Sequence, residues 1–220
     1  MTHRGIPRYT LGEEVAHSVT HGVGIVLAIA GLTVLVAFAA LRGTAWHVVG
    51  AAVYGATLVL AYTASTVYHA IPPTFPGAKH VLRVLDHSAI FLLIAGTYTP
   101  FTLVNLRGPW GWALFGVVWG LAVLGIIFEA TLIGRLRVLS VAFYVVLGWL
   151  VLIAARPLAS SVATGGLVLL IGGGVAYTAG VAFYAWQRLP YHHAIWHGFV
   201  LVGSALHFFA VLFYVVPLAG

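Results

Sequence analysis

Seven uncharged apolar runs constrain this chain more than any other feature of its sequence. Each run has about 18 to 22 residues, the length that a helix rising 1.5 Å per residue needs to cross about 30 Å of hydrocarbon. The runs lie at about residues 22–41, 48–68, 88–106, 110–128, 138–155, 165–186 and 198–216. The connecting segments are short and rich in Arg, Lys, Pro and Gly, which end helices. We therefore predict an all-α integral membrane protein, a seven-helix transmembrane bundle with one domain over residues 1–220.

The composition excludes several other classes of protein. The chain is 62% hydrophobic and 6% charged, with a mean hydropathy of +1.06, which does not suit a soluble globular surface. Its ten basic residues are scattered singly and form no stripe of the kind that nucleic-acid-binding proteins carry, so we expect no nucleic-acid partner. The sequence has no cysteine. Any bound metal must therefore be held by nitrogen and oxygen ligands.

The basic residues predict the orientation of the bundle. The positive-inside rule assigns the side with more Lys and Arg to the cytoplasm. Seven such residues fall on the side of the N-terminus and three on the other. The seven are Arg4, Arg8, Lys79, Arg83, Arg135, Arg137 and Arg188, and the three are Arg42, Arg107 and Arg156. This distribution places the N-terminus in the cytoplasm and the C-terminus outside.

The ionisable residues gather at one level of this predicted bundle, on the cytoplasmic side. They come from the start of the first helix, the end of the second, and the starts of the third and seventh. The set comprises Glu13, Glu14, His17, His21, Ser65, His69, Asp86, His87, His192, His193 and His197. Polar side chains are costly in a bilayer, and those that occur there usually face the bundle interior and serve a site. Their coincidence at one depth is the strongest functional signal in the chain.

The spacing of His193 and His197 favours metal binding. Residues four apart on a helix lie on one face, about 6 Å apart along the axis, so two imidazoles can share one ion. Ser65 and His69 repeat this spacing at the end of the second helix. Three neutral imidazoles and a water would give Zn²⁺ the open tetrahedral site of catalytic zinc, with Asp86 as acceptor of the water's proton.

Other histidines have other interpretations. For His3, His47 and His80 we favour solvation or packing at the interface. His207 follows His193 by fourteen residues, so it points to a similar helix face about 21 Å deeper and cannot bind the same ion. It is either a polar contact or a proton-handling residue of the bundle core.

The first helix offers a competing arrangement. Glu14, His17 and His21 share one helix face and could form a second metal half-site. A Glu-x-x-His element is also found in di-iron bundles. The His-x-x-His-His boxes of membrane desaturases do not occur in this sequence, which speaks against a di-iron oxygenase.

At these residues the chain closely resembles the haemolysin III family, the bacterial branch of the progestin and adipoQ receptor family. The resemblance extends from the first predicted helix to the seventh and is specific in combination. The matching segments are residues 13–22 (EEVAHSVTHG), 65–69 (STVYH), 85–90 (LDHSAI), 95–101 (AGTYTPF), 193–197 (HAIWH) and His207 with Phe208.

The resemblance implies a seven-helix zinc protein of a hydrolase superfamily that includes alkaline ceramidases. By matching motifs, His69, His193 and His197 would be the zinc ligands and Asp86 would hold or deprotonate the water. Ser65 would stabilise an oxyanion or support the ligands. His17 stands where many relatives are expected to carry Asn, which keeps a second metal contact open. The implied location is the inner membrane of a bacterium, with the metal site near the cytoplasmic face.

Three functions follow as hypotheses. The first is a zinc-dependent hydrolase-like protein, or a sensor, acting on an amide or ester of a membrane lipid. The second is a receptor-like or membrane-homeostasis protein in which zinc only joins helices. The third is a pore-forming cytolysin, although no predicted helix carries the polar stripe that lines a water-filled channel.

Overall fold

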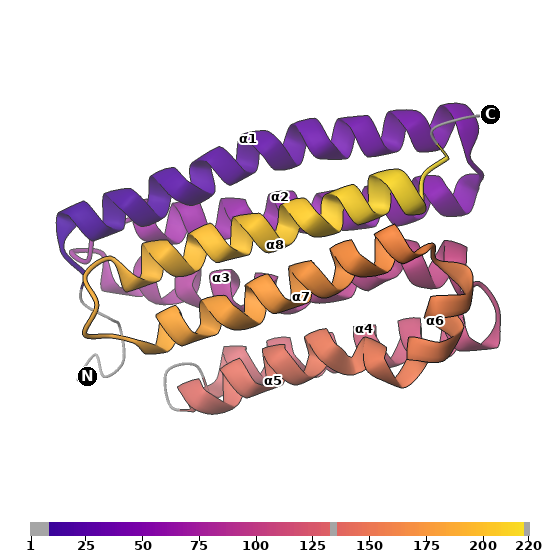
Figure 1. Ribbon diagram of the computed structural model, residues 1–220. Coiled ribbons are helices and arrows are strands. Elements are labelled where there is room, and N and C mark those ends of the chain that lie inside the picture. Colours follow the sequence, from indigo (N-terminus) through magenta and orange to yellow (C-terminus); the bar gives the residue numbers. More distant parts are fainter. Residues whose placement is uncertain (1–8, 133–135, 218–220) are drawn as a thin grey trace.

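The computed structural model describes residues 9–132 and 136–217 as a bundle of long helices (Figure 1). Within these residues, seven helical segments are long and apolar enough to cross a membrane. The predicted all-α, seven-helix membrane fold is therefore confirmed. His3, Arg4, Arg8 and Arg135, to which the sequence analysis gave roles, lie outside the described residues.

The structure gives each helix definite bounds. They are α1 (Leu11–Arg42), α2 (Ala45–Ala70), α3 (Pro76–Pro100), the π-helical η1 (Phe101–Asn105), α4 (Pro109–Leu132), α5 (Arg137–Trp149), the 3₁₀ segment η2 (Leu150–Ala154), α6 (Ala155–Ser161), α7 (Thr164–Ala185) and α8 (His192–Tyr214). The odd number of crossings puts the start of α1 and the end of α8 at opposite ends of the bundle (Figure 1).

The first helix begins about three turns before its predicted apolar run. Thr10 caps α1: its side chain accepts a hydrogen bond from the Glu13 backbone N–H at 3.3 Å, and its own N–H donates to the Glu13 carboxylate at 2.8 Å. This reciprocal pair satisfies two backbone donors at the helix start. Hydropathy therefore missed the polar first turns of α1.

The third helix differs most from its prediction. It begins at Pro76, since a proline at the first helical position loses no hydrogen bond there. The prediction that Asp86 and His87 open the third helix is therefore wrong, because almost three turns precede them. Lys79 and Arg83, which we interpreted as loop residues marking the cytoplasmic surface, lie inside this helix and are only 1% and 5% exposed.

A π-helical turn follows Pro100 at the end of α3. Pro100 has no backbone N–H, and the next segment, η1, widens so that the Leu106 N–H bonds to the Phe101 carbonyl at 2.9 Å. Asn105 then donates to the Tyr214 carbonyl at 3.3 Å, which fastens this end of the third crossing to α8.

The fifth crossing is longer and less regular than its predicted run of 138–155. It consists of α5, η2 and α6 and extends to Ser161. The Tyr98 hydroxyl meets the break between α5 and η2: it donates to the Gly148 carbonyl at 2.8 Å and accepts from the Val151 N–H at 2.8 Å. This side chain thus supplies partners that the interrupted helix lacks.

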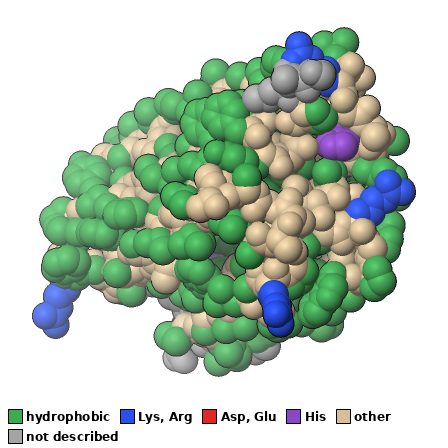
Figure 2. All heavy atoms as spheres, turned by 45° about the vertical axis from the view of Figure 1, so that its right-hand side comes forward, with side chains coloured by type: hydrophobic (Ala, Val, Ile, Leu, Met, Phe, Trp, Pro, Cys, Tyr) green, Lys and Arg blue, Asp and Glu red, His purple; other side chains and the backbone are tan. Residues whose placement is uncertain are grey.

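The outer surface is suited to lipid. In Figure 2 the visible face is covered mainly by hydrophobic side chains, and its few basic side chains lie near the periphery. Leu27, Leu124 and Ile153 are among the large apolar residues that stay more than half exposed. Exposed apolar area on this scale indicates a membrane environment.

Helices α2 and α3 pack closely against each other at a glycine. A methyl group on Gly96 of α3 would meet the Thr57 side chain of α2, whereas methyl groups on Gly116 and Gly120 would meet nothing within 4 Å in the described structure. Gly116 and Gly120 therefore make no close helix contact in the described structure. They face outward from α4, and Gly96 has the packing role.

This contrast gives a stability prediction. Gly96→Ala is expected to lower the free energy of unfolding by about 1–3 kcal/mol, because the added methyl group forces α2 and α3 apart. Gly116→Ala is the matched control and is expected to keep or slightly raise stability, because alanine favours the helix. Thermal unfolding in detergent, followed by circular dichroism, measures both. Equal midpoints for the two variants would contradict the packing assignment.

Candidate metal centre

Three helices bring the predicted site together at one end of the bundle. α2 runs antiparallel to α1, so the end of α2 lies beside the start of α1, and α8 begins at the same end (Figure 1). His17 and His21 come from α1, His69 from α2, and His193 and His197 from α8; all five side chains are buried. Residues up to 180 positions apart in the chain thus form one histidine cluster.

The three predicted zinc ligands are neighbours within this cluster. One ring nitrogen from each of His69, His193 and His197 lies within 4.8 Å of the other two. Their ring centroids are 4.6 to 5.3 Å apart. Since all three nitrogens converge, these side chains can hold one metal ion.

Two of these rings are oriented by hydrogen-bond acceptors on their outer side. His69 Nδ1 lies 2.6 Å from Glu14 Oε2, and His197 Nδ1 lies 3.3 Å from the His17 carbonyl oxygen. An imidazole that donates through Nδ1 presents the lone pair of Nε2, which is the form that binds a metal. Metal-binding histidines usually have such a carboxylate or carbonyl behind them.

The inner nitrogens lack protein partners. Among the described residues, His69 Nε2 and His193 Nδ1 are buried without a hydrogen bond. A buried polar atom without a partner costs free energy, and a bound cation would satisfy these lone pairs. The donor set is three imidazoles without a thiolate, which suits zinc and other divalent transition metals. The residues present therefore fit a zinc ion.

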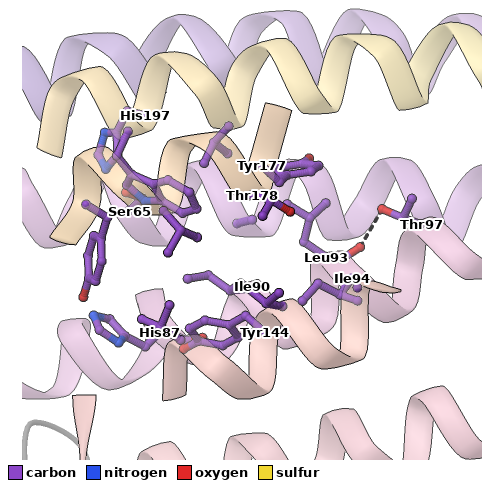
Figure 3. Close-up of a pocket in the computed structure, with 18 of the residues that line it drawn as sticks. Ser65, His87, Ile90, Leu93, Ile94, Thr97, Tyr144, Tyr177, Thr178 and His197 are labelled. Atoms are coloured by element: carbon purple, nitrogen blue, oxygen red, sulfur yellow. Dashed lines mark hydrogen bonds between the residues drawn. The ribbon is translucent and has the colours of Figure 1, made fainter. Parts of the chain in front are cut away.

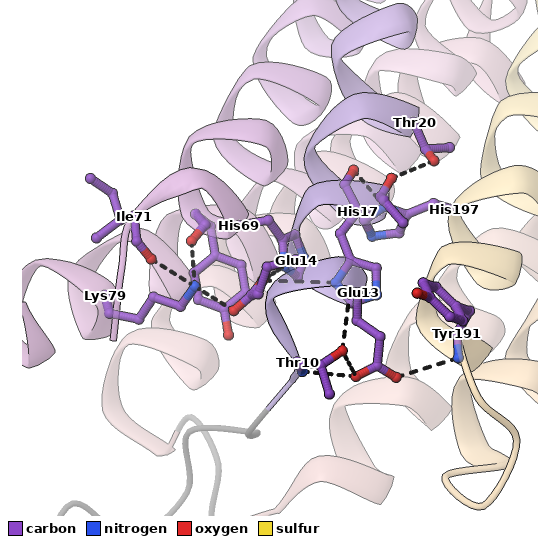
Figure 4. A network of polar contacts seen from close by, with 12 residues as sticks. Thr10, Glu13, Glu14, His17, Thr20, His69, Ile71, Lys79, Tyr191 and His197 are labelled. Carbon is purple, nitrogen blue, oxygen red and sulfur yellow. Dashed lines mark hydrogen bonds and ion pairs between the residues drawn. The ribbon is translucent and has the colours of Figure 1, made fainter. Parts of the chain in front are cut away.

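Glu14 connects the cluster to the third helix (Figure 4). Its Oε2 contacts His69, and its Oε1 accepts from Lys79 Nζ at 2.8 Å. Lys79 Nζ also donates to the Tyr68 and Ile71 carbonyls, at 2.9 and 3.0 Å. The ammonium thus uses three donors, and its charge balances a carboxylate held among histidines.

The first-helix half-site is rearranged relative to the prediction. Glu14 and His17 group with His69, within 4.8 Å of one another, and this is a second set that could hold a metal. His21 belongs to neither set and instead stacks on His197, with ring centroids 3.6 Å apart. Because both sets contain His69, they compete for one ligand.

Two polar residues of the predicted set have local structural contacts. The Glu13 carboxylate caps α1 and accepts the Tyr191 N–H at 3.3 Å, and Tyr191 has the left-handed φ of 56° at the start of α8. His192 Nδ1 lies 3.1 Å from the Phe183 carbonyl at the end of α7. Both contacts fix the entry of α8 into the cluster.

A cavity opens beside the cluster, and Figure 3 shows Ser65 and His197 at one end of it. It has a volume of about 170 Å³ and is lined by Ser65, Asp86, His193 and His197 among others. Ser65 of α2 and Asp86 of α3 line this cavity from neighbouring helices. The two residues predicted for catalysis thus share one cavity with two of the predicted ligands.

An apolar second chamber adjoins this cavity. This chamber has a volume of about 250 Å³, and leucines such as Leu106, Leu158 and Leu167 line it. Tyr98, Trp149 and His207 line both chambers. The site therefore has a long, mostly apolar space behind it, running between the third, fifth, sixth and seventh crossings.

His207 lies away from the cluster, as predicted. Ten residues separate it from His197, which is about 15 Å along α8. Its Nε2 lies 3.0 Å from the Leu170 carbonyl, and its ring centroid is 5.5 Å from that of Tyr177. These are the contacts of a core residue that joins α7 and α8.

Two residues beside the cluster and the cavity were not predicted from the sequence. The ring of Tyr9 lies against His17 and His193, at 4.7 and 5.4 Å between centroids, and no motif signalled it. Glu129 is only 1% exposed and lies 3.6 Å from His87 Nδ1. The predicted fourth run stopped at residue 128, whereas α4 continues to Leu132. The sequence signal that could have identified Glu129 is a lone acidic residue inside a membrane helix.

The outer contact of His69 gives a prediction for metal affinity. Glu14→Gln is expected to weaken zinc binding about 10- to 100-fold, because the amide no longer holds the His69 tautomer as a carboxylate does. Competition with a chromophoric chelator in detergent measures the dissociation constant. Glu13→Gln is the matched control, since that neighbouring carboxylate caps the helix and touches none of the three ligands. An affinity equal to that of wild type would contradict the role of Glu14.

Comparisons with known proteins agree with this architecture. The family model described as haemolysin-III related matches residues 9–208. The "Hemolysin-3 homolog" of Bacillus subtilis (strain 168) is 47% identical over 208 residues, which cover 94% of this chain and 97% of that protein. "Hemolysin-3" of Bacillus cereus is also 47% identical, with 94% of each chain covered.

A more distant relative is animal. The human "Monocyte to macrophage differentiation factor" is 29% identical over 219 residues, which cover 96% of this chain and 90% of that protein. The family match covers every residue of the histidine cluster, and it also covers Ser65 and Asp86. This seven-helix membrane protein belongs to the haemolysin III family.

Proposed function

We propose that this protein is a zinc-dependent hydrolase that acts on an amide or ester of a membrane lipid. The observation that carries the proposal is the convergence of His69, His193 and His197 at the end of an apolar cavity that Ser65 and Asp86 also line. This combination supports the proposal, because candidate metal ligands, a candidate acid–base group and an apolar cavity lie together.

The chain's own residues divide the chemistry among them. Bound zinc would supply the Lewis acidity that polarises a carbonyl and activates water. The three histidines hold the ion, and Glu14 fixes the orientation of His69. The Asp86 carboxylate accepts the proton of the attacking water, and the Ser65 hydroxyl in the same cavity stabilises the oxyanion that forms.

The cavity supports a lipid substrate. Its walls carry Leu93, Ile94 and Val200, and the second chamber is lined mainly by leucine and other apolar residues. Such walls exclude water and favour a hydrocarbon chain. The resemblance to alkaline ceramidases agrees with an acyl chain joined through an amide.

The proposed location follows from the basic residues and the relatives. We place the histidine cluster at the cytoplasmic side of a bacterial inner membrane. The bacterial relatives support this placement, as does the excess of Lys and Arg on the side of the bundle that carries the histidine cluster.

One observation also favours the second hypothesis, in which zinc only joins helices. The ligands come from α2 and α8, and His17 and Glu14 link them to α1, so a bound ion would fasten the bundle. A structural zinc predicts loss of stability without turnover when the metal is removed.

Turnover distinguishes the two functions. Wild-type protein in detergent is stripped of metal, divided, and reloaded with zinc or left empty. Release of fatty acid is then measured from N-acylsphingosine and from a panel of other N-acyl and O-acyl lipids. We expect release by the zinc-loaded sample and at least a 100-fold lower rate in the empty one. Stability that depends on zinc without any fatty-acid release would favour the structural role.

A further inference from the structure

A second histidine–carboxylate pair lies in the wall of the same cavity. His87 of α3 lines the cavity, and its Nδ1 is 3.6 Å from Oε2 of Glu129 on α4. The His87 side chain is 16% exposed and that of Glu129 is 1% exposed. In Figure 3, His87 and Tyr144 lie across the cavity from Ser65 and His197, at the same end.

Tyr144 of α5 holds this pair in place. Its hydroxyl lies 3.1 Å from Glu129 Oε1 and 3.1 Å from the His87 carbonyl oxygen. The Tyr144 ring packs on Phe91, with centroids 4.6 Å apart. The Glu129 carboxylate therefore contacts two helices. Its Oε1 contacts Tyr144 of α5, and its Oε2 faces the His87 imidazole of α3.

The burial of Glu129 requires an explanation. A carboxylate in the interior of a membrane bundle is costly unless it is paired, and such residues usually serve a site. Glu129 is in neither of the two groups that could hold a metal. Its partners His87 and Tyr144 both line the cavity, so the acid supports the cavity wall opposite the histidine cluster.

A carboxylate behind an imidazole has a known chemical consequence. It fixes the tautomer and orientation of the ring, and it stabilises the imidazolium form, so that the ring can transfer a proton at its other nitrogen. Hydrolysis of an amide or alkyl ester needs two proton transfers, one from the attacking water and one to the leaving atom, and a second titratable group can carry out the latter. Asp86 has the first transfer in the proposed function, which leaves the second to another group.

We propose that His87, positioned by Glu129, is the general acid that protonates the leaving group. This inference rests on the proposed function. Water adds to the substrate carbonyl carbon while Asp86 takes its proton. The bond between carbon and the leaving nitrogen or oxygen then breaks, and that atom keeps the bonding electrons and receives a proton from the His87 imidazolium. The products are a carboxylic acid and an amine or alcohol, and His87 regains its proton from Asp86 or solvent.

Two substrates with one acyl chain test this assignment. N-lauroylsphingosine has a leaving amine that must be protonated, whereas 4-methylumbelliferyl laurate releases a stable phenolate that needs no proton. His87→Gln is expected to lower the rate on the amide by about 100- to 10,000-fold and the rate on the ester by about threefold or less. Glu129→Gln is expected to show the same pattern with a smaller loss on the amide. Asp86→Asn lowers both rates and is the contrasting variant.

Two readouts are independent of turnover. The zinc content per chain is expected to be equal in wild type, His87→Gln and Glu129→Gln. In metal-free protein, diethyl pyrocarbonate carbethoxylates the neutral form of His87, and mass spectrometry locates the product. The pH at which the rate is half-maximal is expected to be lower in Glu129→Gln, because the ring loses the carboxylate that stabilises its imidazolium form. A merely structural contact leaves this midpoint unchanged when the variant is folded.

The possible outcomes distinguish failure of the general-acid assignment from failure of the proposed function. Equal losses on amide and ester in His87→Gln, or no loss on either, overturn the general-acid assignment while the hydrolase proposal stands. An unchanged pH midpoint of carbethoxylation in Glu129→Gln overturns the positioning by Glu129. Absence of turnover of both substrates by zinc-loaded wild type removes the proposed function, and the assignment with it.

Discussion

Replacing His193 with alanine is expected to reduce the zinc content from about one ion per chain to less than about one tenth. Two ligands and a water bind zinc far more weakly than three imidazoles, because each lost ligand removes a strong bond to the ion. Elemental mass spectrometry of protein purified without added metal measures the content. His69→Ala is expected to give the same loss.

The matched control for this experiment is His80→Ala. His80 is an exposed histidine of α3, at the same end of the bundle, and it belongs to neither group that could hold a metal. The control should keep the wild-type zinc content. Retention of a full equivalent of zinc in both His193→Ala and His69→Ala would contradict the assignment of these ligands.

Asp86→Asn is expected to lower fatty-acid release by about 100- to 10,000-fold while the zinc content stays at the wild-type level. The amide keeps the size of the side chain but cannot accept a proton from water, so the chemical step loses its base. The rate is measured on the lipid that the wild type hydrolyses best, at saturating substrate.

Ser88→Ala is the control for Asp86→Asn. Ser88 is buried on the same helix, two residues further on, and it lines neither described cavity. It should keep turnover within about threefold of wild type. Full turnover by Asp86→Asn would exclude Asp86 as the base and leave the cavity without the chemistry assigned to it.

The membrane fold could be predicted from the sequence because hydrocarbon thickness dictates the length of an apolar run. The helix ends could not be predicted in this way. α1 and α3 continue through polar turns whose side chains face the histidine cluster or cap a helix, and hydropathy counts these residues against a helix. The same limitation excluded Glu129 from the fourth run.

The ligand set could be anticipated because the spacing of His193 and His197 is a local property of one helix. The contacts that tune the set are not local. Glu14 reaches His69 on α2 and Lys79 on α3, which lie 55 and 65 residues away. Pairing at such separations depends on how three helices pack, and a single sequence gives no direct sign of it.

The count of basic residues that predicted the orientation also included side chains that are buried. Lys79 and Arg83 were counted as surface charges, yet the structure buries both, and Lys79 is bound to Glu14 and two carbonyls. A basic residue that neutralises an internal acid carries little information about orientation. With these two residues omitted, five basic residues remain on the predicted cytoplasmic side against three on the other, so the predicted orientation is unchanged.

X-ray absorption at the zinc edge of purified wild-type protein tests the three-histidine zinc site, because it counts the atoms around the ion. We expect one zinc with three imidazole nitrogens and one further nitrogen or oxygen ligand, all at about 2.0–2.1 Å. A spectrum with two imidazoles and a carboxylate would point to the group of Glu14, His17 and His69 instead. That result, or protein that binds no zinc, would contradict a catalytic centre built from His69, His193 and His197.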